Sequence, residues 1–507
     1  MSSMNFGETD ASRLVRVQEF VYERRPAIKK IIQKHGNESL LRYALGYYEP
    51  LSGQLTQRQQ ELIDAIKQYT QTKLGPAVAD RVSQRLRRYY VASTADHMGP
   101  VVHPFFLSSN LLSALPQIVR PQADLHSVVV FACASVSLEN SSFPRGLVYH
   151  SKNSDTEQKL PFFSTHIRPS IISHLPAYGQ DEMRKVKKSL GASARLGQIT
   201  KAEAEFLKSL LDEVYNQPEI MALPSFSDQV TQTNYRLWQK YFPAGVTAPE
   251  LIYLELESVV TEILLKHHMQ ADTVIHRLLF SPESWPWLDR FAGIAGAFSQ
   301  TDHSGTFMFW GVPPGARRRV RMIKHGNHLV CEDGSYKIEL TAPAIGAALR
   351  RHEIIPGVLL DFIVLACYYG LKCQGGFSQV NYLTEIKAAY NDIISKLGYP
   401  KSEFSQVITS ELCGDIIAVF LQGLKGQLLP ATGIDWLMHH GAKTWEIFTA
   451  QCQALTLAET LNPVMPEFYR ILYTEKERYP ELASLTAADI MQATGLLKKI
   501  IPGLTCA

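Results

Sequence analysis

Apolar residues recur at helical spacing in three long stretches of the chain, residues 10–90, 180–300 and 343–507. In the first stretch, Val78, Val82 and Leu86 follow Pro76 at the intervals that place apolar side chains on one face of a helix. In the second stretch, residues 247–250 resemble a helix-capping sequence, and the apolar pattern continues to Phe280. We therefore predict one long helix over residues 251–280.

Strand patterns separate these helical stretches. Residues 127–137 form a continuous apolar and β-branched run, which is typical of a strand buried on both faces. Shorter strand candidates follow at 146–150 and 160–167, so we predict a central sheet near residues 125–170.

A second strand region, residues 305–342, predicts a small antiparallel meander. Two of its strand candidates flank His325, Gly326 and Asn327, a sequence suited to a hairpin turn. The predicted fold class is therefore α+β and predominantly helical.

The order of these patterns suggests three regions along the chain. They are an N-terminal helical region (1–92), a mixed α/β core with a helical insertion at 180–300 (93–342), and a C-terminal helical region (343–507). No clear linker separates them, so one interwoven domain remains the alternative.

Charge and cysteine content narrow the partners and the compartment. The 507 residues include 51 basic and 48 acidic side chains, a net charge of +3, which gives no overall field for nucleic acid. The seven cysteines show no zinc-knuckle spacing and are mostly flanked by apolar residues, as expected of reduced thiols in the cytoplasm. Residues 1–13 lack the apolar core of a secretory signal, and the apolar run 354–371 is interrupted by Asp361. We therefore expect a soluble, cytoplasmic protein that does not associate with a membrane.

The densest group of chemically active side chains lies at residues 93–105. Asp96, His97 and His103 occur there among Gly99 and two prolines, which favour a loop over a helix. In one hypothesis, His97 and His103 coordinate a divalent metal ion, and Asp96 either coordinates it as well or orients one of the histidines. Another makes His97 a general base whose tautomer a carboxylate fixes, and Thr94 a substrate contact. A purely structural alternative has Asp96 and Thr94 capping turns.

Side chains at the ends of the strand candidates supply possible partners for this loop. His150 ends one strand and is a candidate third metal ligand, while His166 ends another and is a candidate substrate contact. Arg145 and Arg168 carry the paired donors that hold a carboxylate or a phosphate.

A double glycine marks a second candidate site. Gly375 and Gly376 precede a predicted helix in which Ser378 suits the cap and Gln379 follows. Backbone N–H groups exposed at such a turn can hold an anion, although the phosphate-loop motif itself is absent. A tight turn between helices is the alternative interpretation.

The basic run Arg317, Arg318 and Arg319, with Arg321 and Lys324 beyond it, could bind phosphate or nucleic acid, but exposed turn charges are the interpretation that we favour. The chain also lacks the dinucleotide, nucleophile-elbow, kinase and EF-hand signatures. Two hypotheses remain. The first is an enzyme that acts on a small anionic metabolite with Asp96, His97 and His103, by acid–base or metal-assisted chemistry. The second is a non-catalytic helical protein that docks partners.

Overall fold

The fold was obtained as a computed structural model. It describes residues 9–120, 126–270, 272–299, 305–407, 412–424, 427–440, 443–500 and 504–505. Helices make up 53% of the structure and strands 15%, which confirms the predicted α+β, predominantly helical class. The division into three regions stays a prediction.

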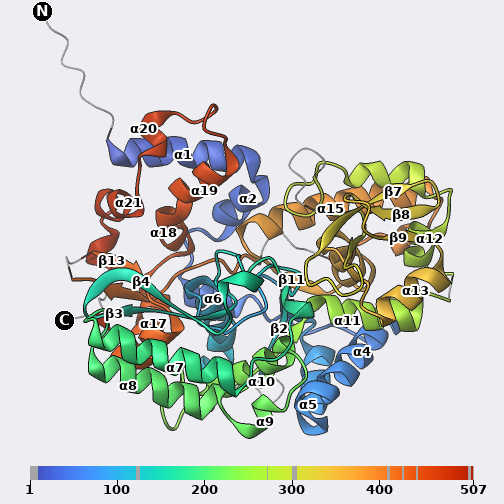
Figure 1. The fold of residues 1–507 in the computed structure, drawn as a ribbon. Coiled ribbons are helices and arrows are strands. Elements are labelled where there is room, and N and C mark those ends of the chain that lie inside the picture. The colour runs from blue at the N-terminus through green and yellow to red at the C-terminus, as the bar shows by residue number, and fades with distance from the viewer. Residues whose placement is uncertain are drawn as a thin grey trace, which may run out of the picture.

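Within the described residues, four strands form a parallel sheet in the order β11-β1-β2-β5. Their bounds are β1 (Val91–Ser93), β2 (Ser127–Ala132), β5 (Glu250–Glu255) and β11 (Lys372–Gln374). Only β2 comes from the segment 125–170 that predicted the sheet. The other three strands come from distant parts of the chain, so their carboxyl ends bring distant loops together (Figure 1).

Both faces of the parallel sheet are covered by helices. Along β2, Val128 and Val130 face a buried cluster that includes side chains of α6 (Pro104–Val119) and α10 (Phe226–Gln239). The intervening residues Val129 and Phe131 face a second cluster with α4 (Gln57–Leu74) and α5 (Pro76–Arg88). Because successive side chains of a strand point to opposite faces, burial on both sides requires the continuous apolar run seen in the sequence.

The predicted long helix over residues 251–280 is wrong: it begins as a strand, and the helix that follows ends at His268, before a separate helix at Val274–Phe280. Residues Glu250–Glu255 are β5, and they pair with β2 in parallel register, Ser127 opposite Glu250 and Ala132 opposite Glu255. Leu251, Ile252, Tyr253 and Leu254 are all buried, two towards each apolar cluster. A short run that is apolar at every position fits a buried strand as well as a helix, and pairing with β2 decides between them.

Smaller antiparallel sheets surround this core. Strands β3 (Gly146–Ser151) and β4 (Ser154–Pro161) form a hairpin. The described residues also contain a five-stranded sheet of order β10-β6-β7-β8-β9, which confirms the predicted meander. Its strands are β6 (Phe309–Gly311), β7 (Val320–His325), β8 (His328–Cys331), β9 (Lys337–Glu339) and β10 (Ile354–Pro356). The predicted turn is present, and Gly326 has a φ of +59°, which favours glycine.

The remaining helices surround these sheets, and β12 (Phe420–Gln422), β13 (Leu428–Pro430) and β14 (Leu504–Thr505) form a small edge sheet. In the described residues, the further α-helices of at least four residues are α1 (Asp10–Arg24), α2 (Pro26–His35), α3 (Leu40–Leu45), α7 (Gln180–Arg195), α8 (Lys201–Leu210), α9 (Pro218–Met221), α11 (Leu256–Ile263), α12 (Val274–Phe280), α13 (Ala342–Arg350), α14 (Val358–Phe362), α15 (Phe377–Lys396), α17 (Lys443–Ala454), α18 (Leu457–Leu461), α19 (Met465–Leu472), α20 (Pro480–Ala483) and α21 (Ala487–Ala493). None of the described helices is long and apolar enough to cross a membrane.

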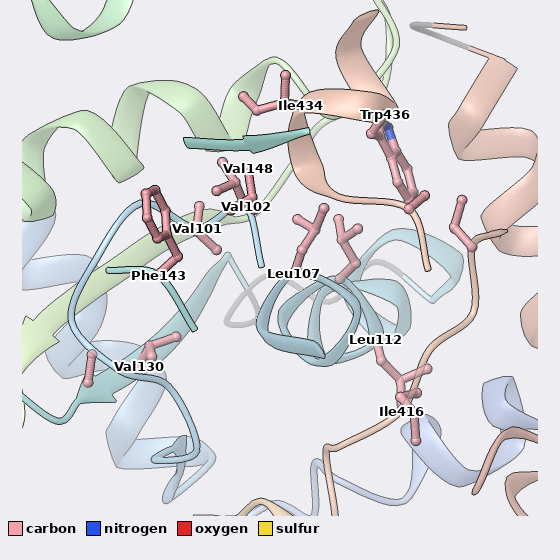
Figure 2. Close-up of a cluster of buried hydrophobic side chains, with 14 of the residues drawn as sticks. Val101, Val102, Leu107, Leu112, Val130, Phe143, Val148, Ile416, Ile434 and Trp436 are labelled. Atoms are coloured by element: carbon pink, nitrogen blue, oxygen red, sulfur yellow. The ribbon is translucent and has the colours of Figure 1, made fainter. Parts of the chain in front are cut away.

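Helix α6 connects β1 to β2 and anchors the loop that precedes it. Its buried residues Leu107 and Leu112 join a cluster with Ile416 and Trp436 from the C-terminal part of the chain (Figure 2). Val101, in the loop itself, belongs to the same cluster. The loop before α6 is therefore held by packing against buried neighbours on several sides.

Candidate functional site

A cavity of about 440 Å³ lies where the carboxyl ends of the parallel strands meet. The loop after β1 contributes His97 and His103, the segment after β2 contributes Cys133, and the turn after β11 contributes Gly376. Arg319, from the turn before β7, completes the polar lining on one side. Ligands in sheets of parallel strands bind at this edge, because the loops that follow the strands converge there. The cavity therefore has the position expected of a binding site.

His97 is half-buried and held in one tautomer. Its Nδ1–H donates to Asn140 Oδ1 at 3.0 Å and lies 3.1 Å from Ser142 Oγ, which itself donates to Asn140. Burial lowers the pKa of His97 to about 4, so the ring is neutral at pH 7. With the proton on Nδ1, Nε2 has a free lone pair and no hydrogen bond within the described residues. Nε2 is the atom available to accept a proton from a ligand.

His103 lies on the same cavity, directly before the first turn of α6. Its ring centroid is 4.9 Å from that of Phe106, which is in turn 5.4 Å from the ring centroid of His97. Burial, and then the nearby charges of His97 and Lys159, lower the pKa of His103 to about 4. The enclosed Nδ1 of His103 has no hydrogen-bond partner in the part of the chain that the structure describes. Two neutral imidazoles from one loop thus share an aromatic neighbour and a cavity.

Asp96 belongs to the site but is fully enclosed. Its Oδ2 accepts a hydrogen bond from Asn110 Nδ2 at 2.8 Å, and Ser93 Oγ lies 3.5 Å from Oδ1. Burial raises the pKa of Asp96 to about 7. Its backbone carbonyl accepts from Cys133 N–H at 2.8 Å, which joins the loop after β1 to the segment after β2. Asp96 is therefore placed to hold the loop in position, behind the side chains that a ligand would touch.

The double glycine lies at the cavity as well. Gly376 is the residue before α15, and the N–H of Phe377 donates to Asp415 Oδ2 at 2.6 Å. We predicted that the N–H groups at this helix terminus could hold an anion, and in the structure the carboxylate of Asp415 occupies that position. Thr94 and Gln379 are buried and hydrogen-bonded to each other. Ser378 and Gly376 reach the cavity wall, while Gly375 lies beside it and pairs with Cys413.

Cys133 and Arg319 extend the site beyond the predicted residues. Cys133 donates its thiol proton to Glu257 Oε1, with the sulfur 3.2 Å away, and Glu257 also accepts from Ala134 and Ser135 N–H. Burial and then Glu257 raise the pKa of Cys133 well above its usual value. Arg319 donates to Ser135 Oγ at 3.1 Å and stacks 4.1 Å from the Trp310 ring centroid. Since a guanidinium has five N–H donors, most of its donors stay available for a ligand.

Besides Gly375, four predicted site residues lie outside the cavity lining. His166 and Arg168 are exposed in and after the 3₁₀ turn Thr165–Ile167, and Arg145 is buried beside the β3–β4 hairpin. His150 is buried, with its Nδ1 2.7 Å from Asp435 Oδ2 and its backbone N–H bonded to the same carboxylate. The predicted third metal ligand is thus engaged elsewhere. In the part of the chain that the structure describes, no three His, Cys, Asp or Glu side chains are arranged to hold a metal ion.

The polar residues at the cavity that we did not predict from the sequence lie far along the chain from the loop of His97 and His103. Asp415 follows no recognisable motif, and Glu257 was assigned to a helix without a role. Arg319 belongs to a basic run in the sequence, and it is half-buried whereas its neighbours Arg317 and Arg318 are exposed. Of the described cysteines, all free, Cys133 is the half-buried one, and Cys506 lies outside the described residues.

Comparison with known proteins adds no family to this picture: no protein-family model matches the chain, and no curated protein matches it either.

Proposed function

We propose that the chain is an enzyme that acts on a small anionic metabolite by general acid–base chemistry in the cavity lined by His97, His103 and Arg319. The observation that carries this proposal is the convergence of these three side chains on one hollow at the carboxyl edge of the parallel sheet. Polar side chains of shifted pKa gathered in a concave site are typical of catalytic centres.

The neighbouring groups suggest how the roles divide. Arg319 binds the anionic group of the substrate, because its guanidinium is fixed by Trp310 and Ser135 and keeps further donors. His97 accepts a proton through Nε2, since Asn140 and Ser142 engage its other nitrogen. His103 lies beside it as the second proton-transfer group. Asp96 is a positioning residue, because its side chain is enclosed behind the loop.

The alternative of a non-catalytic docking protein predicts that residues 93–105 lie apart from any cavity. Their position on the cavity wall weighs against it. The metal-assisted version of the enzyme retains His97 and His103 but lacks the third ligand that the sequence suggested, so we derive no step through a metal. Cytoplasmic location stays a prediction from the reduced thiols.

The test is turnover of a mixture of small carboxylates and phosphate esters, followed by mass spectrometry. We expect the full chain to consume at least one component, and His97→Gln, His103→Gln and Arg319→Gln to slow that reaction at least about a hundredfold. His166→Gln is the matched control, because it makes the same change at an exposed site outside the cavity. Metal analysis of the same samples tests the metal-assisted version. Equal turnover by the wild type and the three cavity variants would refute the proposal.

A further inference from the structure

Arg145 is a buried cation that has no ion-pair partner among the described residues. Its side chain belongs to a residue that is only 9% exposed, and its Nε and Nη1 are enclosed with no hydrogen-bond acceptor in the described structure. A guanidinium keeps its charge inside a protein, and an enclosed charge without a partner is costly to maintain. Arg145 therefore calls for an anion that the described residues do not supply.

Two further cations belong to the surroundings of Arg145: Lys159 shares an aromatic neighbour with it, and the charge of Arg168 acts on it. The Arg145 Cζ is 4.9 Å and the Lys159 Nζ is 5.5 Å from the centroid of the Phe143 ring. Burial and then the charge of Arg168 lower the pKa of Arg145, while Glu139 acts in the opposite direction. Lys159 and Arg168 are exposed. The group thus has one enclosed cation at its base and two cations open to solvent.

The acidic side chains near this group do not neutralise it. Glu139 is exposed and forms no ion pair with Arg145 in the described residues, and Glu157 Oε1 lies 3.6 Å from Lys159 Nζ on the surface of the hairpin. An exposed pair of this kind contributes little because water and salt screen it. Positive charge therefore dominates around the Phe143 ring.

The backbone that carries Arg145 is strained. Phe143 has a φ of +53°, which is unusual for a bulky residue, and its N–H bonds to the Asn140 carbonyl at 3.0 Å. The next residue, Pro144, packs so closely on Gly99 that a Cβ there would lie 2.8 Å from the Pro144 Cα. Strained backbone that packing maintains is concentrated at binding sites. The same loop holds His97 through Asn140 and Ser142, so the cation group and the cavity share one rigid support.

We propose that Arg145, Lys159 and Arg168 form a binding site for a phosphoryl group, carried by free phosphate or by a phosphate monoester. Three cations suit a dianion better than a carboxylate, and the planar guanidinium matches the phosphate oxygens. None of the three side chains lines the cavity of His97 and His103. The site is therefore additional to the proposed catalytic cavity and does not rest on the function proposed for it.

Calorimetric titration of the full chain with inorganic phosphate at low salt and pH 8 tests this site. We expect saturable binding that Arg145→Gln and Arg168→Gln each weaken, the former at least about tenfold because it removes a charge-assisted hydrogen bond. Arg184→Gln is the matched control, since Arg184 is exposed and pairs only with Asp181. Arg168 is exposed, so its variant keeps the test valid if Arg145→Gln folds poorly.

Two further titrations sharpen the assignment. Acetate should bind at least about tenfold more weakly than phosphate, because it carries one charge instead of two. Methyl phosphate should compete with inorganic phosphate, and the tighter of the two identifies the natural carrier of the phosphoryl group. Absence of phosphate binding, equal binding by Arg168→Gln and Arg184→Gln, or acetate binding as tight as phosphate would overturn the proposal.

Discussion

The Nδ1 of His97 lies 3.0 Å from Oδ1 of Asn140, and this contact sets the chemistry available at the other ring nitrogen. An amide oxygen only accepts hydrogen bonds, so Nδ1 carries the proton and Nε2 carries the lone pair that faces a ligand. The arrangement leaves the ring of His97 neutral at pH 7, with Nε2 as the atom that can accept a proton.

Asn140→Ala is expected to release this tautomer. Because the Asn140 hydrogen bond raises the pKa of His97 against the effect of burial, its loss should lower that pKa further. Nitrogen-15 NMR of the histidine rings measures both the tautomer and the pKa of His97. Asn153→Ala is the control, since the Asn153 side chain, in the turn between β3 and β4, donates to Gly197 O and not to His97. A wild-type spectrum showing the proton on Nε2 of His97 would contradict the account.

Asp96→Asn should change how stability depends on pH. The folded pKa of Asp96 is raised to about 7 from an ordinary value near 4, so between these values the folded state holds a proton that the unfolded state has lost. The contribution of Asp96 to stability is therefore complete below about pH 4 and is lost as pH rises to about 7.

Denaturant titrations at several pH values measure this effect. Relative to Asp96→Asn, the wild type should lose at most about 1.4 kcal/mol of unfolding free energy for each pH unit between about 4 and 7. A difference between the two proteins that does not vary with pH would show that Asp96 is ionised throughout.

Cys133 should react slowly with iodoacetamide. Its thiol pKa is raised by burial and by Glu257, and Arg319 opposes that shift. The thiolate is the reactive form, so at pH 8 Cys133 should be alkylated at least about tenfold more slowly than a free thiol, and Arg319→Gln should slow it further. Mass spectrometry of the peptide containing Cys133 gives the rate, with Arg318→Gln as the neighbouring control. Faster alkylation in Arg319→Gln would mean that Arg319 does not act on this thiol.

Gly376→Ala should destabilise the protein. An added Cβ would lie 2.7 Å from Asp415 Oδ2, the atom that accepts the Phe377 N–H, so the carboxylate must shift. We expect a loss of about 1–3 kcal/mol in the free energy of unfolding, measured with denaturant. In Gly191→Ala the nearest atom to the new Cβ, outside its own helical backbone, is 4.0 Å away, and the helix there should gain up to about 1 kcal/mol. Similar effects of the two substitutions would contradict the close contact.

Much of the fold could be predicted from local pattern. The apolar run of β2 and the turn at Gly326 are set by residues close in sequence, and both predictions are confirmed. The strands β1 and β11 are three residues each, too short to show a period, and they pair only because distant parts of the chain meet. The sequence of β5 fits a helix as well as a strand because it is apolar at successive positions, and only its pairing with the distant β2 distinguishes the two.

The residues of the candidate site also divide into those that local sequence indicates and those that only distant contacts bring together. The loop with His97 and His103 was visible because glycine and prolines break the helical pattern around its polar side chains. Arg319 and Asp415 reach the cavity from segments far along the chain. Nothing near them in the sequence indicates that they lie beside the loop of His97 and His103. His150 ends a strand as predicted, but that strand belongs to the β3–β4 hairpin, where Asp435 binds its ring.

The most direct test of the central claim is NMR of the histidine rings while small carboxylates and phosphate esters are added to the full chain. The account predicts that a component of the mixture shifts the resonances of His97 and His103 together and saturably, and that Arg319→Gln weakens this response. Saturable shifts of other histidine rings that leave His97 and His103 unchanged would contradict the account, as would the absence of any shift at millimolar concentrations.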